Sequence, residues 1–564
     1  MKVRSLLGIL FVIMLFLGVG GCNGSGGDSS DTSSSNDNSD SSDNNNNNDT
    51  NDDTEWDTTD TTPASSYTID IDFDANTAQV SGGSALDITS AGATLVSTTD
   101  STSITVQTTT YGITVTSTVA AVVTYNLSGT LNGTLTVESE DEYQLCLNGV
   151  TITADEGPAL DLESDQKAYI VLAAGTTNTL EDSATRSDDM TEKATLYGKG
   201  PMVFSGSGTM NITGNYKDGI ATKDYIHVQA GTLNITTGTT AKDAIHAVNA
   251  FIFDDGTLTI HANGTNEGDE GMGIKVVGDD DSSYGAGKGY VEINGGAITI
   301  TSVGKGITAN WDSDTDTGTY TAGNPDPYVE INGGTITITT TGSVYEYSSG
   351  GTTVSCAPEG IEGKSRVTIS GGTIIVNATE DGINAGDAIT ISGGSLYVKS
   401  TGNDVDAFDS NGSITISGGV VVAVAPNGGT CNSFDKGDGG SDIFSITGGT
   451  IVGIGGVTCR LTSSACTQNV VVLGSLTSGR TMALVADDGT VALAFTIPQT
   501  YATMVLSSPA ITTGTSYGIY TGGTATGDET FYGLFLGDLD YSGGSSSSSF
   551  TVSSRITQVG GSYF

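Results

Sequence analysis

Basic residues are scarce in this chain. Its 564 residues include 19 Lys and Arg against 65 Asp and Glu, which gives a formal net charge of −46. No Lys or Arg occurs between Arg4 and Lys167. Binding of nucleic acid needs clustered basic side chains, so this balance argues against a nucleic acid partner. It also opposes direct capture of an anionic polymer unless cations lie between the two.

Histidine, aromatic residues and metal-type cysteine pairs are scarce as well. There are three His, and Phe, Trp and Tyr together make up 7% of the chain. Five cysteines follow Cys22, and none has the C-x-x-C spacing of a zinc site. Cys459 and Cys466 are spaced to close a small loop in an oxidising compartment, with buried free thiols as the equal alternative. Helical periodicity is also absent after residue 22.

Glycine is abundant, with 80 residues, and much of it lies in a repeated phrase. The phrase reads Gly, a mostly small residue, an apolar residue, any residue and usually a second apolar residue. Its nine copies are separated by 23, 25, 40, 38, 38, 22, 25 and 30 residues, a base period of 22 to 25 with insertions. Such a period is typical of a solenoid. The copies begin at Gly208, Gly231, Gly256, Gly296, Gly334, Gly372, Gly394, Gly419 and Gly449.

Two further phrases complete the repeat. An alternating apolar triplet precedes the glycine turn, as in Val291–Ile293, and an acidic residue or Lys followed by Gly-Ile lies between repeats, as at Asp381. Alternation at period two predicts three short strands per repeat, with Val and Ile on one face. Three short strands bury that face only by stacking, so the pattern predicts an all-β chain folded as a parallel β-helix. A sandwich of hairpins, the competing fold, would show Asn-Gly turns and no fixed period.

The start of the chain differs from this central region. Residues 1–22 have a basic start, an apolar core and a lipobox-like Val-Gly-Gly-Cys, which predicts a lipoprotein signal peptide with Cys22 acylated. An ordinary cleaved signal peptide is the alternative. Residues 23–66 are almost pure Ser, Asp, Asn, Thr and Gly, the composition of a disordered tether. We therefore expect an exported protein that meets the membrane of the cell envelope only through its lipid anchor.

The remaining segments complete the expected domain organisation. We expect residues 67–200 to form an N-terminal cap and the first coils, and residues 201–466 to form the β-helix. Residues 467–564 are expected to form a C-terminal antiparallel β meander cap and tail, because an uncovered last coil would expose a strand edge. Within that segment, the Ser- and Gly-rich residues 528–564 are expected to be partly irregular.

Acidic residues recur in step with the repeats. Asp218 and Asp243 are 25 residues apart, for example. Because adjacent strands lie about 4.8 Å apart, such carboxylates stack at that spacing and repel by roughly 3 kcal/mol at an effective dielectric constant near 20. Calcium accepts oxygen ligands at about 2.4 Å, so one ion fits between two of them. For any single Asp, turn formation alone is the alternative. The predicted Ca²⁺ ligands are Asp218, Asp243, Glu359, Asp381, Asp404, Asp406 and Asp409.

Several segments occur in an order that resembles a known family. They are Leu172–Asp182, Gly206–Ile212, Tyr216–Ile220, the serial Gly-Gly turns and Val505–Pro509. Over roughly residues 120–525 they resemble the bacterial secreted, calcium-containing carbohydrate-binding β-helix family, whose studied clostridial member binds polygalacturonate and cellulose. The resemblance implies a right-handed parallel β-helix, bound Ca²⁺ and binding of an acidic, pectate-like plant polysaccharide without turnover. Asp218 and Asp381 match the family's Asp-Gly-Ile phrase, and Asp243 matches it with Ala in place of Gly.

Together these features predict a surface-tethered, calcium-dependent polysaccharide-binding protein that is a monomer and not an enzyme. A long face of regularly spaced polar side chains suits an extended polymer, and calcium would bridge uronate carboxylates to the aspartates. Each contact candidate is equally compatible with an ordinary outward-facing strand residue. The candidates are Tyr216, Lys223, Lys242, Lys275, Tyr397 and Lys399.

Two alternative functions are weighed against this one. A calcium-dependent polysaccharide lyase or hydrolase needs a base beside the ion or a carboxylate pair. Lys364, Arg366 and Lys399 are the only bases close in sequence to the densest acidic cluster, which spans residues 381–409. A surface adhesin fits the signal peptide, the tether and the solenoid equally well.

Overall fold

The computed structural model describes residues 60–89, 92–97, 102–186, 192–279, 288–312, 326–349 and 352–563. The predicted signal peptide, its Cys22 and most of the predicted tether lie outside these residues. The described part consists of β-strands and turns and contains no helix, so the all-β prediction is confirmed there. Accordingly, no helix in these ranges is long and apolar enough to cross a bilayer.

Each central repeat contributes three short strands, as the alternation predicts, and equivalent strands form three columns. The first column contains β14 (Met202–Gly206), β17 (Tyr225–Val228), β20 (Ala250–Phe253), β23 (Tyr290–Ile293), β26 (Val329–Ile331), β31 (Arg366–Ile369), β34 (Ala388–Ile391), β37 (Ser413–Ile416) and β40 (Phe444–Ile446). The second contains β15 (Thr209–Gly214), β18 (Thr232–Thr237), β21 (Thr257–Ala262), β24 (Ala297–Ser302), β27 (Thr335–Thr340), β32 (Thr373–Ala378), β35 (Ser395–Ser400), β38 (Val420–Val424) and β41 (Thr450–Gly455). The third contains β13 (Ala194–Gly198), β16 (Asp218–Thr222), β19 (Ile245–Ala247), β22 (Ile274–Asp279), β25 (Ile307–Asp312), β30 (Ile361–Gly363), β33 (Ile383–Ala385), β36 (Phe408–Ser410) and β39 (Asp435–Lys436).

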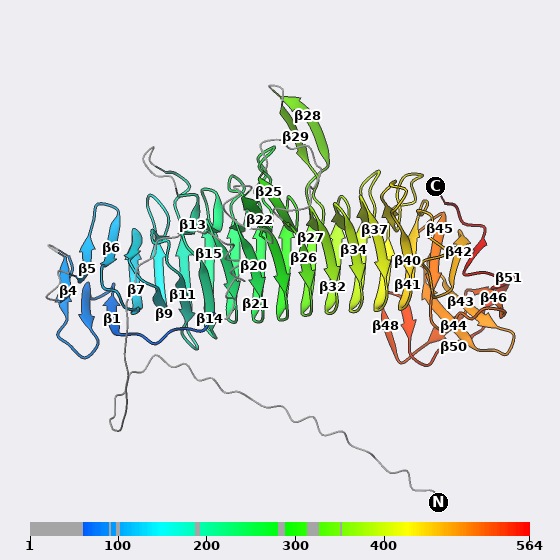
Figure 1. Cartoon of the computed structure of the whole chain (residues 1–564), viewed down its shortest axis with the longest axis horizontal. Coiled ribbons are helices and arrows are strands. Elements are labelled where there is room, and N and C mark those ends of the chain that lie inside the picture. Colours follow the sequence, from blue (N-terminus) through cyan, green and yellow to red (C-terminus); the bar gives the residue numbers. More distant parts are fainter. Residues whose placement is uncertain are drawn as a thin grey trace, which may run out of the picture. The chain divides into compact units, whose positions relative to one another are not determined.

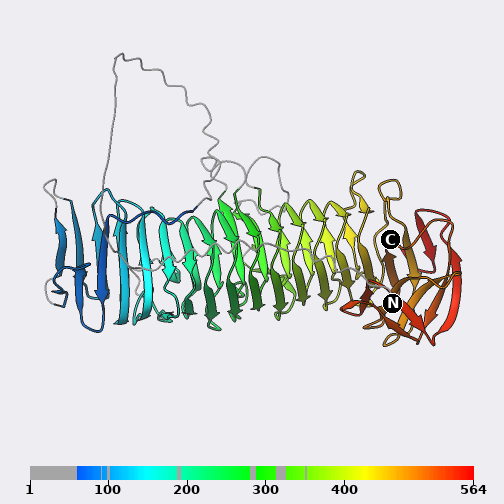
Figure 2. The same cartoon turned by 90° about the horizontal axis from the view of Figure 1, so that it is seen from below.

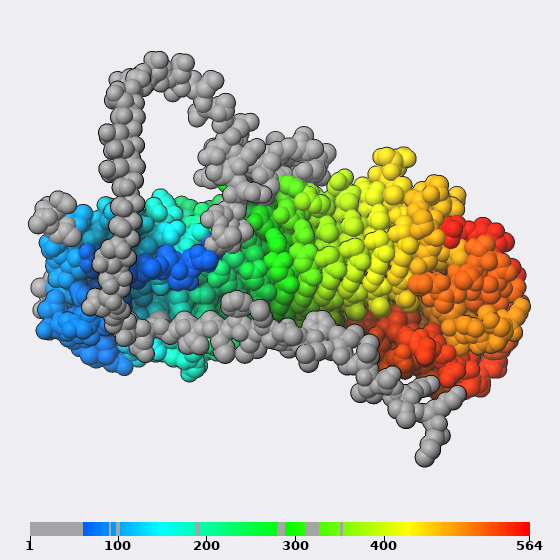
Figure 3. Space-filling model, turned by 60° about the horizontal axis from the view of Figure 1, so that its bottom comes forward, coloured from blue at the N-terminus to red at the C-terminus, as the bar shows by residue number. Residues whose placement is uncertain are grey.

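Within each column, every strand pairs in parallel with its counterpart in the next repeat (Figure 1). The first two columns belong to a 28-stranded sheet and the third to a 14-stranded sheet. Figure 2 shows the same succession of strands from below. In the space-filling view, the colours follow one another in sequence order along the stack (Figure 3).

The apolar core runs through the middle of the stack. Ile298 and Ile300 of β24 pair in register with Ile336 and Ile338 of β27, and all four side chains are at most 1% exposed. Full burial of one such side chain contributes about 1.5–3 kcal/mol. The Thr residues between them face outward. Strict alternation therefore separates an apolar interior from a polar outer face, and that outer face is where function must lie.

The repeated glycines are required where the chain turns between the first and second columns. Gly334 has a φ of 86°, a conformation that side chains with a Cβ rarely adopt. A Cβ atom at this position would lie 2.5 Å from the carbonyl oxygen of Gly295, the equivalent turn of the preceding repeat. The turn glycine therefore permits both the backbone conformation and the close stacking of repeats.

The N-terminal strands combine hairpins with the first parallel pairings. β4, β5 and β6 pair antiparallel, whereas β6 and β8 pair in parallel. Residues 60–66 belonged to the predicted tether, yet Asp60 is only 2% exposed and its carboxylate accepts a hydrogen bond of 2.9 Å from Tyr225. The strands are β1 (Tyr67–Asp72), β2 (Thr77–Val80), β3 (Leu86–Asp87), β4 (Ala93–Ser97), β5 (Ser103–Thr108), β6 (Gly112–Ser117), β7 (Val123–Asn132), β8 (Thr134–Ser139), β9 (Tyr143–Thr153), β10 (Leu160–Leu162), β11 (Ala168–Leu172) and β12 (Thr177–Glu181).

At the other end, the pairing changes from parallel to antiparallel. β45 pairs antiparallel with β41, the last strand of the second column, and thereby covers its edge. Residues 528–564 contain short strands separated by irregular segments, and β51 pairs through its backbone although its sequence is mostly Ser. The strands are β42 (Val470–Gly474), β43 (Thr481–Ala486), β44 (Val491–Thr496), β45 (Thr503–Ser507), β46 (Ser516–Thr521), β47 (Thr524–Thr526), β48 (Glu529–Phe531), β49 (Leu534–Leu536), β50 (Asp540–Ser542), β51 (Ser545–Thr551) and β52 (Ile556–Val559).

Two local features complete the description. A hairpin of β28 (Tyr345–Ser349) and β29 (Thr352–Cys356) projects from the stack (Figure 1). Cys459 and Cys466 do not form the disulfide considered from the sequence. Both thiols are free and buried, as are those of Cys356 and Cys431.

Candidate metal centre

Two columns of side chains run along the third-column strands. The leading column contains, from each repeat, the residue that precedes or begins the third-column strand. Backbone hydrogen bonds join these equivalent positions in successive repeats. The outer column is the residue after the first core position of the strand, and parallel pairing sets its register. The leading column reads Asp218, Asp243, Met272, Lys305, Glu359, Asp381, Asp406 and Asn432. The outer column reads Ala221, His246, Lys275, Thr308, Glu362, Asn384, Asp409 and Asp435.

The acids of the leading column have a structural role. One Asp218 carboxylate oxygen accepts the backbone N–H of Asp243 at 3.2 Å, and an Asp243 oxygen accepts that of Met272 at 3.0 Å. Asp381 accepts the N–H of Asp406 in the same way at 2.6 Å. Each carboxylate therefore ties its repeat to the next through one oxygen, which leaves the other oxygen for a second partner.

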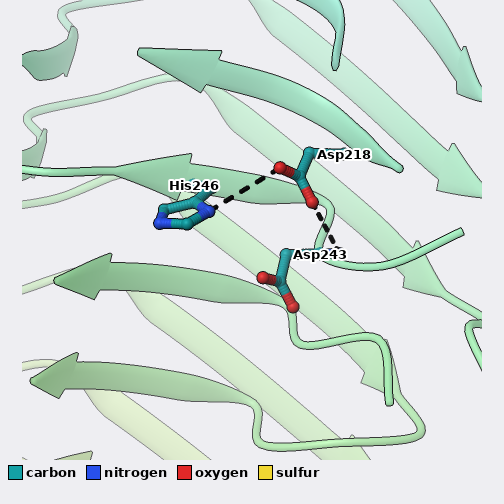
Figure 4. Close-up of side chains that lie close together, drawn as sticks. All are labelled: Asp218, Asp243 and His246. Carbon is teal, nitrogen blue, oxygen red and sulfur yellow. Dashed lines mark hydrogen bonds and ion pairs between the residues drawn. The ribbon is translucent and has the colours of Figure 1, made fainter. Parts of the chain in front are cut away.

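In the first half of the columns, from Asp218 to Lys305 in the leading column, that partner is a basic side chain of the protein itself. The second oxygen of Asp218 lies 3.6 Å from Nδ1 of His246, and that of Asp243 lies 3.5 Å from Nζ of Lys275. Figure 4 shows Asp218 and Asp243 on successive repeats, with the His246 ring directed at Asp218. Burial raises the pKa of Asp243 although Lys275 opposes it, and Asp243 in turn raises the pKa of Lys275.

Lys305 balances the centre of the columns. Its ammonium pairs with Glu359 and lies 3.0 Å from a carboxylate oxygen of Glu362, which Lys364 also contacts at 2.5 Å. Burial and the neighbouring Glu362 raise the pKa of Glu359 to about 8. Burial acts in the same sense on Glu362, but Lys305 and Lys364 outweigh it and lower its pKa to about 2. These two acids therefore share a buried positive charge.

In the second half of the columns, from Asp381 to Asn432 in the leading column, no basic side chain of the described residues pairs with the acids. Asp381, Asp406, Asp409 and Asp435 form no ion pair with any residue that the structure describes. Burial and the carboxylates of Glu380 and Asp409 raise the pKa of Asp381 to about 10. Burial, with Asp435 and Asp409 nearby, raises the pKa of Asp406 to about 8.

The same deficit extends to the other acids of this half. Burial and the Asp435 carboxylate raise the pKa of Asp409 to about 7, and burial raises that of Asp435. Lys436 is adjacent in sequence, but its ammonium donates a hydrogen bond to the carbonyl of Gly437 at 2.7 Å. Several acids that are buried next to one another thus lack a positive partner within the described ranges.

Unpartnered oxygen atoms lie in the same place. The side-chain oxygen of Asn432 and one carboxylate oxygen of Asp435 are buried and accept no hydrogen bond from the described residues. Asn432 is 3% exposed, and its backbone N–H donates to Asp406. A buried hydrogen-bond acceptor without a donor costs roughly 1–3 kcal/mol. A cation bound by these oxygen atoms would remove that cost. Oxygen-only donors of this kind fit a hard cation such as Ca²⁺.

Four groups of side chains in the described residues bring possible ligand atoms within 4.8 Å of one another. Three of them unite six of the seven predicted metal ligands. Asp404 is the exception, because it occupies an exposed turn with a φ of 59°. The groups are Asp218–Asp243–His246, Glu359–Glu380–Asp381, Asp406–Asp409–Asp435 and Asp161–Glu163–Glu192.

Glu380, Asp435 and His246 were not among the predicted ligands. Asp435 has a signal in the sequence, because it follows Asp409 by one period of 26 residues. His246 sits three residues after Asp243 but belongs to the outer column, which the Asp-Gly-Ile phrase does not mark. Glu380 directly precedes Asp381, and no repeated spacing in the sequence marks it as a ligand.

A family profile described as carbohydrate-binding domain-containing protein matches residues 111–405, just over half of the chain. The chain belongs to this carbohydrate-binding domain family. A relative described as a carbohydrate-binding domain-containing protein, from Acetivibrio thermocellus, is 28% identical over 118 residues, which are 20% of this chain and 41% of the relative. The chain therefore matches less than half the length of that relative. A solved structure described as the polysaccharide lyase-like protein from C. thermocellum, gadolinium derivative, is similar at 20% identity, with a TM-score of 0.31 over 62% of this chain and 96% of that one.

In this member of the carbohydrate-binding domain family, the predicted sugar contacts do not form one cluster. Tyr397 and Lys399 lie on β35 of the 28-stranded sheet, and Lys223 follows β16 of the 14-stranded sheet several repeats away. The Tyr397 ring stacks on Tyr532 with centroids 3.8 Å apart, so one of its faces is covered. Lys242 pairs with Asp269.

The other two candidates, Tyr216 and Lys275, also have partners. The guanidinium of Arg186 lies 4.8 Å from the centre of the Tyr216 ring, and the Lys217 ammonium lies 5.7 Å from it. Lys275 belongs to the outer column and faces Asp243. Lys223 and Lys399 are at least partly exposed and have no ion pair within the described part of the chain. Of the predicted contacts, these two lysines have the most freedom to meet a ligand.

Proposed function

We propose that this chain is a calcium-dependent polysaccharide-binding protein of the cell envelope that captures acidic, pectate-like glycans without cleaving them. We further propose that its stacked repeats wind as a right-handed parallel β-helix, which the parallel register of all three columns supports. Membership of the carbohydrate-binding domain family supports the class of ligand. The observation that carries the calcium proposal is the lack of positive charge in the second half of the columns.

Calcium suits this half for a geometric reason. Two atoms that each lie about 2.4 Å from an ion are at most about 4.8 Å apart, and calcium takes six to eight oxygen ligands. The ligand atoms of Asp406, Asp409 and Asp435 lie within 4.8 Å of one another. A divalent ion there offsets the mutual repulsion that raises their pKa values. The unpartnered oxygen of Asn432 is a further candidate ligand.

The ion also reconciles an acidic protein with an acidic glycan. With a formal net charge of −46, the chain repels a polyuronate in the absence of cations. A calcium ion held by three protein carboxylates keeps open coordination positions for carboxylates of the ligand. The parallel strands of successive repeats also present polar side chains at regular intervals, which suits an extended polymer.

The proposal of binding without turnover rests on the state of the nearby bases. A lyase needs a base beside the ion to remove the proton next to the uronate carboxylate. Lys305 and Lys364 both contact Glu362, and Arg366 pairs with Asp326 and stacks over Tyr328 at 4.3 Å. Burial lowers the pKa of Lys305, but the carboxylates of Glu359 and Glu362 outweigh it and raise that pKa. Lys364 and Arg366 are each engaged by a carboxylate, and together these contacts argue against proton abstraction.

An immobilised-polygalacturonate pulldown tests the proposal. The wild type is expected to be retained with calcium and released by EDTA, whereas Asp406→Asn with Asp409→Asn loses retention at least tenfold. Asp404→Asn is the matched control, because this carboxylate lies outside the groups, and it should behave as the wild type. Retention that EDTA leaves unchanged would remove calcium from the account. Release of unsaturated uronate by the wild type would instead identify a lyase.

The lipid anchor has its own test. We propose that Cys22 carries a lipid, so labelled palmitate should be incorporated by the wild type and not by Cys22→Ser. Incorporation of label into both proteins would overturn the assignment.

A further inference from the structure

A groove of about 700 Å³ lies near the start of the stack, away from the acidic columns. Its walls come from the turn between β1 and β2, the turn between β5 and β6, the end of β7 and the turn after β9. This volume falls within the range of small-ligand sites, about 300–1,000 Å³. None of the predicted sugar contacts lines it.

Tyr111 is the one large aromatic side chain exposed in this groove. It is 47% exposed and sits on the turn between β5 and β6. Its carbonyl accepts the N–H of Thr134 at 2.8 Å, so the neighbouring strand fixes the backbone that carries the ring. Gly133 permits that approach, because a Cβ atom there would lie 2.5 Å from the Tyr111 carbonyl oxygen. The ring is thus an exposed flat surface on a rigid support.

The rest of the lining is polar and acidic. Asn132 and Asp155 are exposed, and their side chains form no hydrogen bond with the described residues, which leaves donors and acceptors free for a ligand. Asp74, Asp155 and Glu156 place three carboxylates around the groove, and its lining contains no Lys, Arg or His. A ligand carboxylate in this groove would meet only negative charge. A ring of neutral hydroxyl groups would find acceptors on three sides.

We propose that this groove is a second glycan-binding site, and that it takes neutral sugars rather than uronates. One face of a pyranose ring presents C–H groups, which pack on the exposed face of Tyr111. The ring's hydroxyls donate to the Asp155 and Glu156 carboxylates and meet the Asn132 amide. The inference rests on the proposed function as a polysaccharide binder. It differs in needing no calcium and in rejecting acidic sugars.

Calorimetric titration in EDTA tests this site apart from the acidic columns. The probes are neutral hexasaccharides of glucose, xylose and mannose, with hexagalacturonate and a glucosamine hexamer as charged counterparts. We expect at least one neutral probe to bind the wild type and Tyr111→Ala to weaken it at least tenfold. Tyr347→Ala is the matched control, because this tyrosine is 41% exposed on the β28–β29 hairpin, outside the groove. It should leave affinity unchanged.

A second variant guards against a folding defect in the first. Asn132→Trp occupies groove volume and should also abolish binding of the neutral probe, while thermal unfolding matches that of the wild type. The site is overturned if no neutral probe binds, or if Tyr111→Ala and Tyr347→Ala weaken binding equally. The neutral-sugar assignment is overturned if hexagalacturonate or the glucosamine hexamer binds more tightly than every neutral probe. Calcium-dependent retention on polygalacturonate is measured separately, so either proposal can fail while the other stands.

Discussion

The two halves of the acidic columns share one backbone and differ in charge. In the first half, His246 and Lys275 of the outer column face Asp218 and Asp243, and Lys305 of the leading column pairs with Glu359. In the second half, the outer column holds Asn384, Asp409 and Asp435. The repeat therefore fixes where side chains stack, and the residues at these two positions decide whether basic side chains of the protein face its own acids or an external cation is needed.

The size of this difference follows from simple electrostatics. Two carboxylates about 4.8 Å apart repel by roughly 3 kcal/mol at an effective dielectric constant near 20. A cation at a similar distance from each carboxylate attracts each of them by a similar amount. Exchanging a neighbouring acid for a lysine thus changes the local balance by several kcal/mol. That is a large fraction of the net stability of an ordinary domain.

The largest expected effect is the removal of the central cation. Lys305→Met leaves Glu359 and Glu362 buried without their shared charge, and loss of one partner of a buried pair costs about 3–5 kcal/mol. Thermal and urea unfolding in EDTA should show that loss of stability. Calcium should restore part of it, because the ion can take the place of the Lys305 ammonium between Glu359 and Glu362.

The control for this variant is Lys364→Met. The Lys364 side chain is 39% exposed, so its ion pair with Glu362 should contribute less than about 1 kcal/mol. Equal losses in the two variants would show that burial of Lys305 has no special role.

The pH dependence of stability should distinguish calcium-free from calcium-loaded protein. The folded pKa values of Asp409 and Asp406, about 7 and about 8, lie above their usual value of 3.8. A carboxyl group with a raised folded pKa favours the folded state most below its unfolded pKa, and this contribution is lost as the pH rises through the folded pKa. In EDTA, the unfolding free energy should therefore fall by several kcal/mol between about pH 4 and pH 9.

Calcium should flatten this dependence, because the bound ion stabilises the ionised carboxylates. Unfolding curves at several pH values, with EDTA or with calcium, provide the measurement. A fall of the same size with calcium present would contradict a cation site in the second half.

A built-in cation should make the second half resemble the first. Asp409→Lys places an ammonium in the outer column, next to Asp381, Asp406 and Asp435. Lys275 occupies the same position four repeats earlier. We expect stability in EDTA to rise by about 1–2 kcal/mol and calcium binding at this group to be lost. Calorimetry with calcium measures both effects. Asp404→Lys, on the exposed turn, should change neither, and an equal response would contradict the comparison.

The smallest expected effect concerns the first half. His246→Gln removes a ring that lies 3.6 Å from Asp218 and is 31% exposed in its side chain, so stability should change by less than about 1 kcal/mol. The number of calcium ions bound should stay the same, because Lys275 still faces Asp243. A newly bound ion in this variant, counted by calorimetry, would show that the imidazole alone keeps calcium out.

The sequence predicts the strands and their register well, for a physical reason. Period-two alternation and glycine turns at fixed spacing dictate which residues face the core and which strands stack. The same register unites Asp218 with Asp243 and Asp409 with Asp435. What it does not supply is the local turn geometry that separates Asp404 from Asp406, two residues apart, because both fit the period within its variation.

A repeat pattern does not predict contacts between segments that are far apart in the sequence. Tyr397 looked like an outward-facing sugar contact, but it stacks on Tyr532, and no spacing relates the two. Asp60 belonged to a segment with the composition of a tether, yet its carboxylate is held by Tyr225 and by Nδ1 of His227 at 2.8 Å. The groove around Tyr111 likewise joins four turns that have no common motif.

Anomalous diffraction from crystals grown with calcium tests the central claim most directly. The account predicts a calcium peak among Asp406, Asp409 and Asp435, with none between Asp218 and Asp243, where the side chains of His246 and Lys275 face the two carboxylates. A peak at Asp218 and Asp243, or no peak at Asp406, Asp409 and Asp435, would contradict it.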